Sequence, residues 1–229
     1  MNKQASSPQE PLLFEEVALS ARERRAIESF KIEAEVGEFE FFGAITDGFF
    51  VRLDEYLKAL GGNSDKVVQS VISAITKPLI RMPSMFDIVS PHFGIIVRAV
   101  LPNLEFEIPR WHTDGSYFTA SRKIYKLVYT VKGEPTRFAF TANQKQFEDL
   151  ANKQNQFALG SVEDLSIRKK LDSLVTEIEL PDFDHFAVYL VGHTDAQIHS
   201  EPNMTESRVF MSSLIGSESE IEELRRRWL

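Results

Sequence analysis

The hydrophobic positions of the first ninety residues recur mostly at the spacing of a helix. Between Phe49 and Leu60, apolar residues follow one another at intervals of three and four, which places them on one helix face. Gly61-Gly62 interrupts this pattern, and Asn63 or Ser64 can cap a further helix. Helices are therefore predicted at 20–31, at 49–60 and from about 64 to Lys77-Pro78, where proline is expected to end the last one. A short strand is predicted at 38–42.

After Pro91 the pattern changes to β-branched and aromatic runs and to strict alternation, both typical of strands. Strands are predicted at 93–101, 104–108, 124–131, 136–140, 175–180, 186–191 and 208–215. Residues 143–173 are polar, and we expect a loop followed by a helix near 162–174. A terminal helix is predicted at 218–229, with acidic residues early and arginines late, in agreement with the helix dipole. These elements predict an α+β protein built on an all-β core.

A chain of 229 residues is more consistent with one domain than with two. Residues 1–11 are polar and are expected to form a flexible tail. Residues 12–229 are expected to form a single domain, in which 12–90 is a mainly helical extension, 91–216 the β core and 217–229 the terminal helix.

Composition excludes several classes of function. The net charge of −8 argues against a broad electrostatic surface for nucleic acid. No cysteine is present, so disulfides, thiolate metal sites and a cysteine nucleophile are excluded. No apolar stretch approaches the length of about 20 residues that a membrane span requires, and residues 1–11 do not resemble a secretory signal. We therefore expect a cytoplasmic protein, and its oligomeric state stays open.

The first candidate for chemistry is the segment that contains His112 and Asp114. In an extended strand, residues two apart project to the same face, so this imidazole and carboxylate would lie side by side. Together with a distant second histidine they would make the 2-His-1-carboxylate facial triad of non-haem Fe(II) oxygenases, which leaves coordination positions open. A simpler interpretation is that His112 ends a strand and that Asp114 begins a turn with Gly115.

Two histidines near the end of the chain could complete the triad. His199 is followed nine residues later by Arg208, whereas His193 belongs to its own His-Thr-Asp segment. His199 is favoured, and His193 is then expected to be exposed, near the substrate or behind the ligands. His92 and His185 have no partner pattern and are expected to be surface or core histidines.

The ordered set His112, Asp114, His199 and Arg208 resembles the Fe(II)/2-oxoglutarate-dependent dioxygenase superfamily, over roughly residues 93–216. The resemblance implies a double-stranded β-helix (a cupin-like jelly roll) buttressed by the N-terminal helices. It also implies that His112, Asp114 and His199 hold Fe(II), while Arg208 pairs with the distal carboxylate of 2-oxoglutarate. A serine often stands two residues after this arginine, but here that position is Phe210, and Ser212 follows two residues later.

The side chains around Arg208 support a buried role for it. Counting by two places Arg208, Phe210 and Ser212 on one face, and an arginine among apolar residues needs an anionic partner. Tyr129 or Thr130 could supply a further hydroxyl, although core packing would explain either residue equally well. The basic residues of this region are expected to form a solvated face or to attract an acidic substrate: Arg122, Lys123, Lys126, Lys132 and Arg137.

The leading hypothesis is thus a non-haem Fe(II)- and 2-oxoglutarate-dependent oxygenase of hydroxylase or demethylase type. One alternative is a cupin-type metalloenzyme that does not use 2-oxoglutarate. Another is a jelly-roll binding protein without catalysis, for which 143–173 and the helical extension would offer a partner surface. No motif identifies the substrate, which could be a small molecule or a protein.

Overall fold

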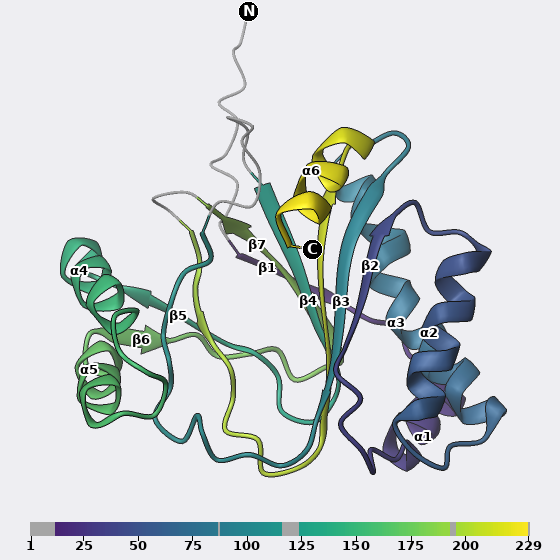
Figure 1. The fold of residues 1–229 in the computed structure, drawn as a ribbon, viewed down its shortest axis with the longest axis horizontal. Coiled ribbons are helices and arrows are strands. Elements are labelled where there is room, and N and C mark those ends of the chain that lie inside the picture. The colour runs from purple at the N-terminus through teal and green to yellow at the C-terminus, as the bar shows by residue number, and fades with distance from the viewer. Residues whose placement is uncertain (1–11, 87, 116–123, 193–195, 229) are drawn as a thin grey trace, which may run out of the picture.

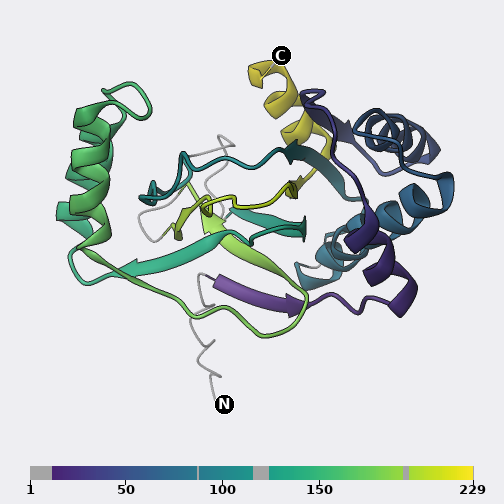
Figure 2. The ribbon, with the colours of Figure 1, turned by 90° about the horizontal axis from the view of Figure 1, so that it is seen from below.

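The fold is built from two antiparallel sheets that face each other, with helices on the outer side of each (Figure 1). A computed structural model describes residues 12–86, 88–115, 124–192 and 196–228, so the expected tail at 1–11 lies outside the described residues. Seen from below, helices flank both ends of the molecule and the strands lie between them (Figure 2). None of the helices within the described ranges has the length and apolar character that crossing a bilayer requires.

The larger sheet has six strands in the order β1-β7-β4-β9-β3-β2. Its strands are β1 (Leu12–Glu16), β2 (Glu38–Gly43), β3 (His92–Val100), β4 (Ile124–Lys132), β7 (His185–Val191) and β9 (Arg208–Gly216). The smaller sheet has the order β6-β5-β8, from β5 (Arg137–Thr141), β6 (Val175–Glu177) and β8 (Ile198–Ser200). Because side chains alternate along a strand, each sheet has one face toward the other sheet and one toward its helices.

Three helices cover the outer face of the larger sheet: α1 (Ala21–Ser29), α2 (Asp47–Ala59) and α3 (Asp65–Met85). Their fully buried residues, such as Phe49 and Leu53, pack against the odd-numbered residues of β3, including Ile95 and Val97. On the outer face of the smaller sheet, α4 (Gln144–Gln154) and α5 (Val162–Asp172) form a second core. The last helix, α6 (Glu218–Trp228), contacts β2, β3 and β9.

This mixed α/β architecture, with a large antiparallel sheet opposite a small one, is consistent with a β-sandwich or with the expected jelly roll. The three N-terminal helices and the terminal helix lie where the sequence predicts them. The same holds for seven of the nine strands: β2, β3, β4, β5, β6, β7 and β9. Strands β1 and β8 and helix α4 were not expected, because their segments are short or carry only scattered apolar residues.

The expectation that Lys77-Pro78 ends a helix was wrong, since α3 continues through Pro78 and Pro83 to Met85. A proline inside a helix costs about 3 kcal/mol. Beyond it, however, Leu79 and Met82 are fully buried against the sheet, and each such burial contributes about 1.5–3 kcal/mol. Burial of the apolar face of α3 is thus comparable with the cost of its two prolines, and the helix continues.

The predicted strand at 104–108 was also wrong, because this segment forms turns around a buried arginine. Arg168 of α5 is 0% exposed, and its Nη1 donates to the backbone oxygens of Glu105 at 2.8 Å and Ile108 at 3.2 Å. The same guanidinium pairs with Asp164 at 2.8 Å. The hydrogen bonds from Arg168, about sixty residues away in the sequence, thus stabilise turns in a segment whose alternating pattern predicts a strand.

Replacing Arg168 by methionine is expected to lower the free energy of unfolding by about 3–5 kcal/mol, because it leaves Asp164 buried and uncompensated. Urea unfolding followed by circular dichroism measures this change. Lys169→Met is the matched control, since Lys169 is exposed on the same helix and should change stability by less than about 0.5 kcal/mol. Equal effects of the two substitutions would contradict this account of the turn.

Candidate metal centre

The main candidate site is a pocket of about 390 Å³ between the two sheets. Strands β3, β4, β7 and β9 supply one wall through residues such as Ile96, Val128, Tyr189 and Ser212. The opposite wall comes from the segments around His112 and His199. All predicted metal ligands therefore line the same pocket.

The backbones of His112 and His199 pair directly, although 87 positions separate them in the sequence numbering. The amide of His112 donates to the oxygen of His199 at 3.0 Å, and the amide of His199 donates back at 2.9 Å. Residues paired in this way project their side chains to the same side. The two imidazole centroids accordingly lie 4.3 Å apart.

Hydrogen bonds to the backbone orient both imidazoles. Nδ1 of His112 lies 2.8 Å from the oxygen of Arg110, and Nδ1 of His199 lies 3.1 Å from the oxygen of Gln197. A carbonyl oxygen can only accept, so in the neutral form of each ring Nδ1 carries the hydrogen and Nε2 keeps its lone pair. Both rings therefore present Nε2 as the potential metal ligand.

Asp114 completes the group, and the three ligand atoms all lie within 4.8 Å of one another. Its Oδ2 accepts from Nζ of Lys126 at 3.0 Å and from the hydroxyl of Tyr189 at 3.0 Å, and it lies 3.6 Å from Nε2 of His199. Burial raises the pKa of Asp114, but the Lys126 ammonium and the two imidazoles more than offset this and hold the pKa well below its usual range. Asp114 is therefore ionised and could serve as a metal ligand.

His199 is buried more deeply than the other two groups. Burial, assisted by the neighbouring His112, lowers the pKa of His199 to about 4, and the charge of Asp114 only partly opposes this. The imidazole is consequently neutral at neutral pH, as a metal ligand must be. The three side chains form the 2-His-1-carboxylate facial arrangement that the sequence predicts. His193, the alternative second histidine, lies outside the described residues.

Arg208 lines the same pocket and is only 4% exposed. Its Nε donates to the backbone oxygen of Glu134 at 2.9 Å, and Nη2 donates to the hydroxyls of Thr136 at 3.0 Å and Thr130 at 3.3 Å. Burial lowers its pKa to about 10 despite the charge of Glu201 nearby. Among the described residues, no carboxylate forms an ion pair with this guanidinium. It is a buried cation for which a ligand could supply the anion.

Gly133 allows the close approach on which Arg208 depends. It has φ +83°, and a Cβ there would lie 2.9 Å from the oxygen of Ser207 and 3.0 Å from Cα of Arg208. Gly133→Ala is thus expected to displace Arg208 and to lower stability by about 1–3 kcal/mol, as measured by thermal unfolding. Gly160→Ala is the matched control, because φ is +75° there but no atom lies within 4 Å of the added Cβ. A loss of stability at Gly133 no larger than that at Gly160 would show that the close contact contributes nothing.

The remaining predicted residues are divided between the two faces of the sheet. Ser212 lines the pocket, and Thr130 contacts Arg208. The expectation that Tyr129 contacts the co-substrate was wrong. Tyr129 is 2% exposed and lies in the core under α1–α3, on the opposite face of the sheet from the pocket. Trp111, which precedes His112, does not line the pocket, and its Nε1 donates to Asp172 of α5 at 2.8 Å.

The expected basic face is dispersed. Lys132 donates to the last backbone oxygens of α1, and Arg137 pairs with Glu177 at 2.6 Å. Lys126 points into the pocket, whereas Arg122 and Lys123 lie outside the described residues. Sequence reasoning missed the roles of Lys126, Tyr189 and Glu201. Counting by two from Thr130 would have placed Lys126 on the pocket side of β4.

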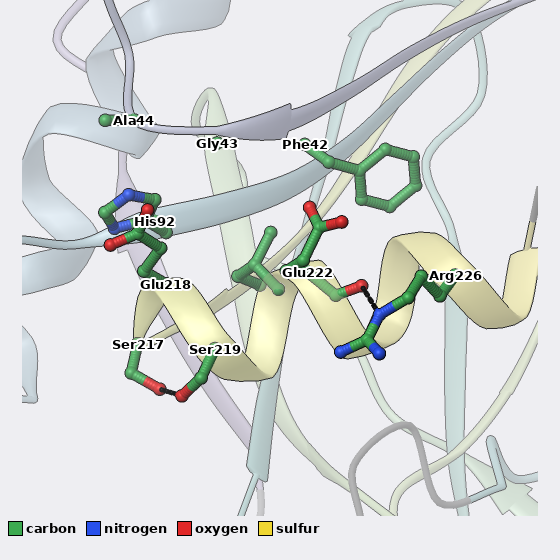
Figure 3. A pocket seen from close by; sticks show the side chains of 10 residues that line it. Phe42, Gly43, Ala44, His92, Ser217, Glu218, Ser219, Glu222 and Arg226 are labelled. Atoms are coloured by element: carbon green, nitrogen blue, oxygen red, sulfur yellow. Dashed lines mark hydrogen bonds between the residues drawn. The ribbon is translucent and has the colours of Figure 1, made fainter.

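A larger hollow, of about 750 Å³, lies between α6 and the end of β2 (Figure 3). His92 and Glu222 line it, and Nε of Arg226 turns back to the backbone oxygen of Glu222 at 3.4 Å. This hollow contains no cluster of potential metal ligands, since the only such cluster among the described residues is His112, Asp114 and His199. The chemistry of this fold is concentrated between the sheets.

No protein-family model matches the chain, and no curated protein matches its sequence. The chain is similar to several solved structures. The viral collagen prolyl hydroxylase of Paramecium bursaria Chlorella virus-1 is 12% identical, over 94% of this chain and 96% of its own, with a TM-score of 0.41. A Pseudomonas putida prolyl-4-hydroxylase is 11% identical, over 90% of this chain and 91% of its own, with a TM-score of 0.36. A Trichoplax adhaerens prolyl hydroxylase, in complex with a hypoxia-inducible factor peptide fragment, is 8% identical, over 94% and 87%, with a TM-score of 0.40.

Proposed function

We propose that this protein is a non-haem Fe(II)- and 2-oxoglutarate-dependent oxygenase of hydroxylase or demethylase type. The observation that carries the proposal is the convergence of His112, Asp114 and His199 at one point of a pocket that is also lined by the buried Arg208.

The donor set fits a divalent transition metal. Two neutral imidazoles and one carboxylate are ligands that Fe(II) accepts, and three protein ligands leave positions for other groups. The chain has no cysteine, so a thiolate zinc site is excluded. A bound iron would supply the redox chemistry that couples oxidation of 2-oxoglutarate by O2 to oxidation of a substrate C–H bond.

The protein's own residues would hold the metal ligands and the co-substrate. Lys126 and Tyr189 both contact Oδ2 of Asp114, and such contacts fix the orientation of a ligating carboxylate. Arg208 would pair with the distal carboxylate of 2-oxoglutarate, because a guanidinium fork matches a carboxylate in geometry and charge. Thr136 and Thr130 already orient this guanidinium, and Ser212 offers a further hydroxyl on the same face.

We further propose that the two sheets form the double-stranded β-helix that the sequence resemblance implies, within a single domain that spans 12–229. The closure of this core between the sheets would keep bulk water from the metal. The helical segments on the outer faces would then buttress the sheets and take no part in the chemistry.

The proposal is tested by adding Fe(II) and 2-oxoglutarate to the purified protein without oxygen. A weak visible charge-transfer band is expected, because a 2-oxo acid chelated to Fe(II) absorbs there. Succinate in place of 2-oxoglutarate is the matched control and should give no band, since it has no 2-oxo group. Absence of the band at saturating concentrations, together with absence of bound iron, would refute the proposal.

A cupin-type metalloenzyme that does not use 2-oxoglutarate is the second candidate. One observation favours it: the carboxylate of Glu201 lines the same pocket, and its charge acts on Arg208. A carboxylate in that position would repel a dicarboxylate co-substrate. Arg208 binds 2-oxoglutarate only if the first candidate is right. Replacing Arg208 and measuring 2-oxoglutarate binding therefore distinguishes the two candidates.

A further inference from the structure

Lys126 is a largely buried cation that pairs directly with a predicted metal ligand. Its side chain is 15% exposed, and its Nζ lies 3.0 Å from Oδ2 of Asp114. It lies on the pocket side of β4, directly opposite Tyr189 of β7, whose hydroxyl donates to the same oxygen at 3.0 Å. Two donors therefore meet at one carboxylate oxygen, and of these two only Lys126 carries a charge.

An ammonium in this position has two opposite effects on a metal. As a hydrogen-bond donor it orients the carboxylate, and the loss of such a contact usually lowers metal affinity by about 10- to 100-fold. As a cation it repels the metal, because a nearby like charge disfavours a second one. Burial raises the pKa of Asp114, and the Lys126 ammonium makes the largest of the contributions that lower it. Tyr189 already supplies a neutral donor, so the distinctive contribution of Lys126 is its charge.

The charged side chains that line the pocket balance one another before any metal binds. Among the described residues, three acids and three basic residues line it: Glu105, Asp114, Glu201, Arg98, Lys126 and Arg208. A divalent metal between neutral imidazoles would add two positive charges to this balanced set. Uncompensated charge is costly in a partly buried site. A dianion in the same pocket would restore neutrality.

We propose that Lys126 makes tight metal binding depend on a dianionic co-substrate in the same pocket. In the metal-free protein its ammonium is a counter-ion of Asp114, and it opposes a divalent metal until a dianion compensates the added charge. Arg208 contributes less to this effect, because its guanidinium donates to a backbone oxygen and two threonine hydroxyls rather than to a metal ligand.

This inference rests on the proposed function for the identity of the dianion, 2-oxoglutarate, but not for the repulsion by Lys126. The coupling between the two ligands is reciprocal, so the metal strengthens binding of the dianion by the same factor. Metal and co-substrate would then enter and leave the pocket largely together.

The test compares the Mn(II) affinity of the full-length wild type with that of Lys126→Met, with and without saturating 2-oxoglutarate. Electron paramagnetic resonance of unbound Mn(II) measures each affinity. Without 2-oxoglutarate, Lys126→Met is expected to bind Mn(II) about 10- to 100-fold more tightly, a coupling of the usual size between two sites. With 2-oxoglutarate, the difference should shrink to less than about threefold. Chelation by the 2-oxo acid is common to both proteins, so this change isolates Lys126.

Three further variants separate charge from orientation. Lys126→Arg keeps the charge and should behave as wild type. Tyr189→Phe is the matched control, because it removes the uncharged donor from the same oxygen and should not raise Mn(II) affinity. Circular dichroism and thermal unfolding establish that each variant is folded. Should Lys126→Met unfold, Lys126→Gln, which keeps a donor without the charge, provides the same comparison.

The inference is overturned if the variant without the charge binds Mn(II) no more tightly than wild type in the absence of 2-oxoglutarate. It is also overturned if 2-oxoglutarate raises Mn(II) affinity equally in both proteins, or if Tyr189→Phe has the same effect as Lys126→Met. An orienting role alone would give the opposite sign, since metal affinity would then fall.

Failure of this inference and failure of the proposed function are distinguishable. If 2-oxoglutarate gives no charge-transfer band with Fe(II), the proposed function fails, and tighter Mn(II) binding by Lys126→Met would still support the repulsion. If the band appears and both proteins bind Mn(II) equally, only the inference about Lys126 fails.

Discussion

Replacing His112 by alanine is expected to weaken Fe(II) binding by more than about 100-fold. Loss of a residue that only supports a metal ligand already costs about 10- to 100-fold in affinity, and His112 would be a ligand itself. Its Nε2 is free to bind because Nδ1 donates to the oxygen of Arg110 at 2.8 Å. Anaerobic titration with Fe(II), or with Co(II) as a spectroscopic substitute, measures the loss.

His185→Ala is the matched control for this substitution. His185 is also a half-buried histidine whose Nδ1 lies 2.8 Å from a backbone oxygen, that of Phe183, but it does not line the pocket between the sheets. Its replacement should leave metal affinity unchanged. If His112→Ala binds iron as tightly as His185→Ala does, the metal centre is not where we place it.

Replacing Arg208 by methionine is expected to weaken 2-oxoglutarate binding by about 100-fold or more. Truncating one partner of a buried charge pair costs about 2–5 kcal/mol, and Arg208 is 4% exposed with no carboxylate of the described residues paired to it. Removal of the cation should leave the affinity for Mn(II) nearly intact, because Arg208 is not among the metal ligands. Calorimetric titration of the metal-free variant with Mn(II) measures the second effect, and titration of the Mn(II)-loaded variant with 2-oxoglutarate measures the first.

Arg98→Met is the matched control, because Arg98 lines the same pocket but is partly exposed and pairs with Glu38 at 2.7 Å. It should change 2-oxoglutarate affinity by less than about threefold, as expected for an exposed charge. An unchanged affinity in Arg208→Met, with metal binding preserved, would favour the cupin-type enzyme that does not use 2-oxoglutarate. Loss of metal binding in that variant would instead indicate that Arg208 is needed for the fold of the site.

The sequence predicted which face of β9 carries Arg208 into the pocket, but it did not predict which face of β4 lines the pocket. On β9 the alternation separates Arg208 and Ser212, in the pocket, from Val209 and Met211, in the core under the helices. Both faces of β4 and of β9 are largely buried, so a period of two gives two sets of residues without indicating which set faces the pocket. On β9 the charge of Arg208 indicated the set, whereas the lysine-containing and tyrosine-containing sets of β4 gave no such choice. Tyr129 was for this reason a plausible ligand contact in the sequence, although it lies in the helix-facing core.

Long-range contacts explain the other differences. The turn at 104–108 depends on Arg168, and the continuation of α3 through Pro78 depends on the sheet that buries Leu79. Neither partner lies within the window of sequence that a periodic pattern covers. Helix α4 was missed because few of its residues are apolar and only Phe147 and Gln154 are buried.

The sequence by itself determined which side chains could bind a metal, since the order of His112, Asp114, His199 and Arg208 and the absence of cysteine are properties of the chain alone. It also determined most helices and strands, because local periodicity follows from which face of each element is buried. Only the tertiary structure decided that His112 and His199 pair through their backbones and that Lys126 and Tyr189 hold Asp114. Those contacts join strands far apart in the chain, and their existence depends on how the two sheets stack, which no short stretch of sequence encodes.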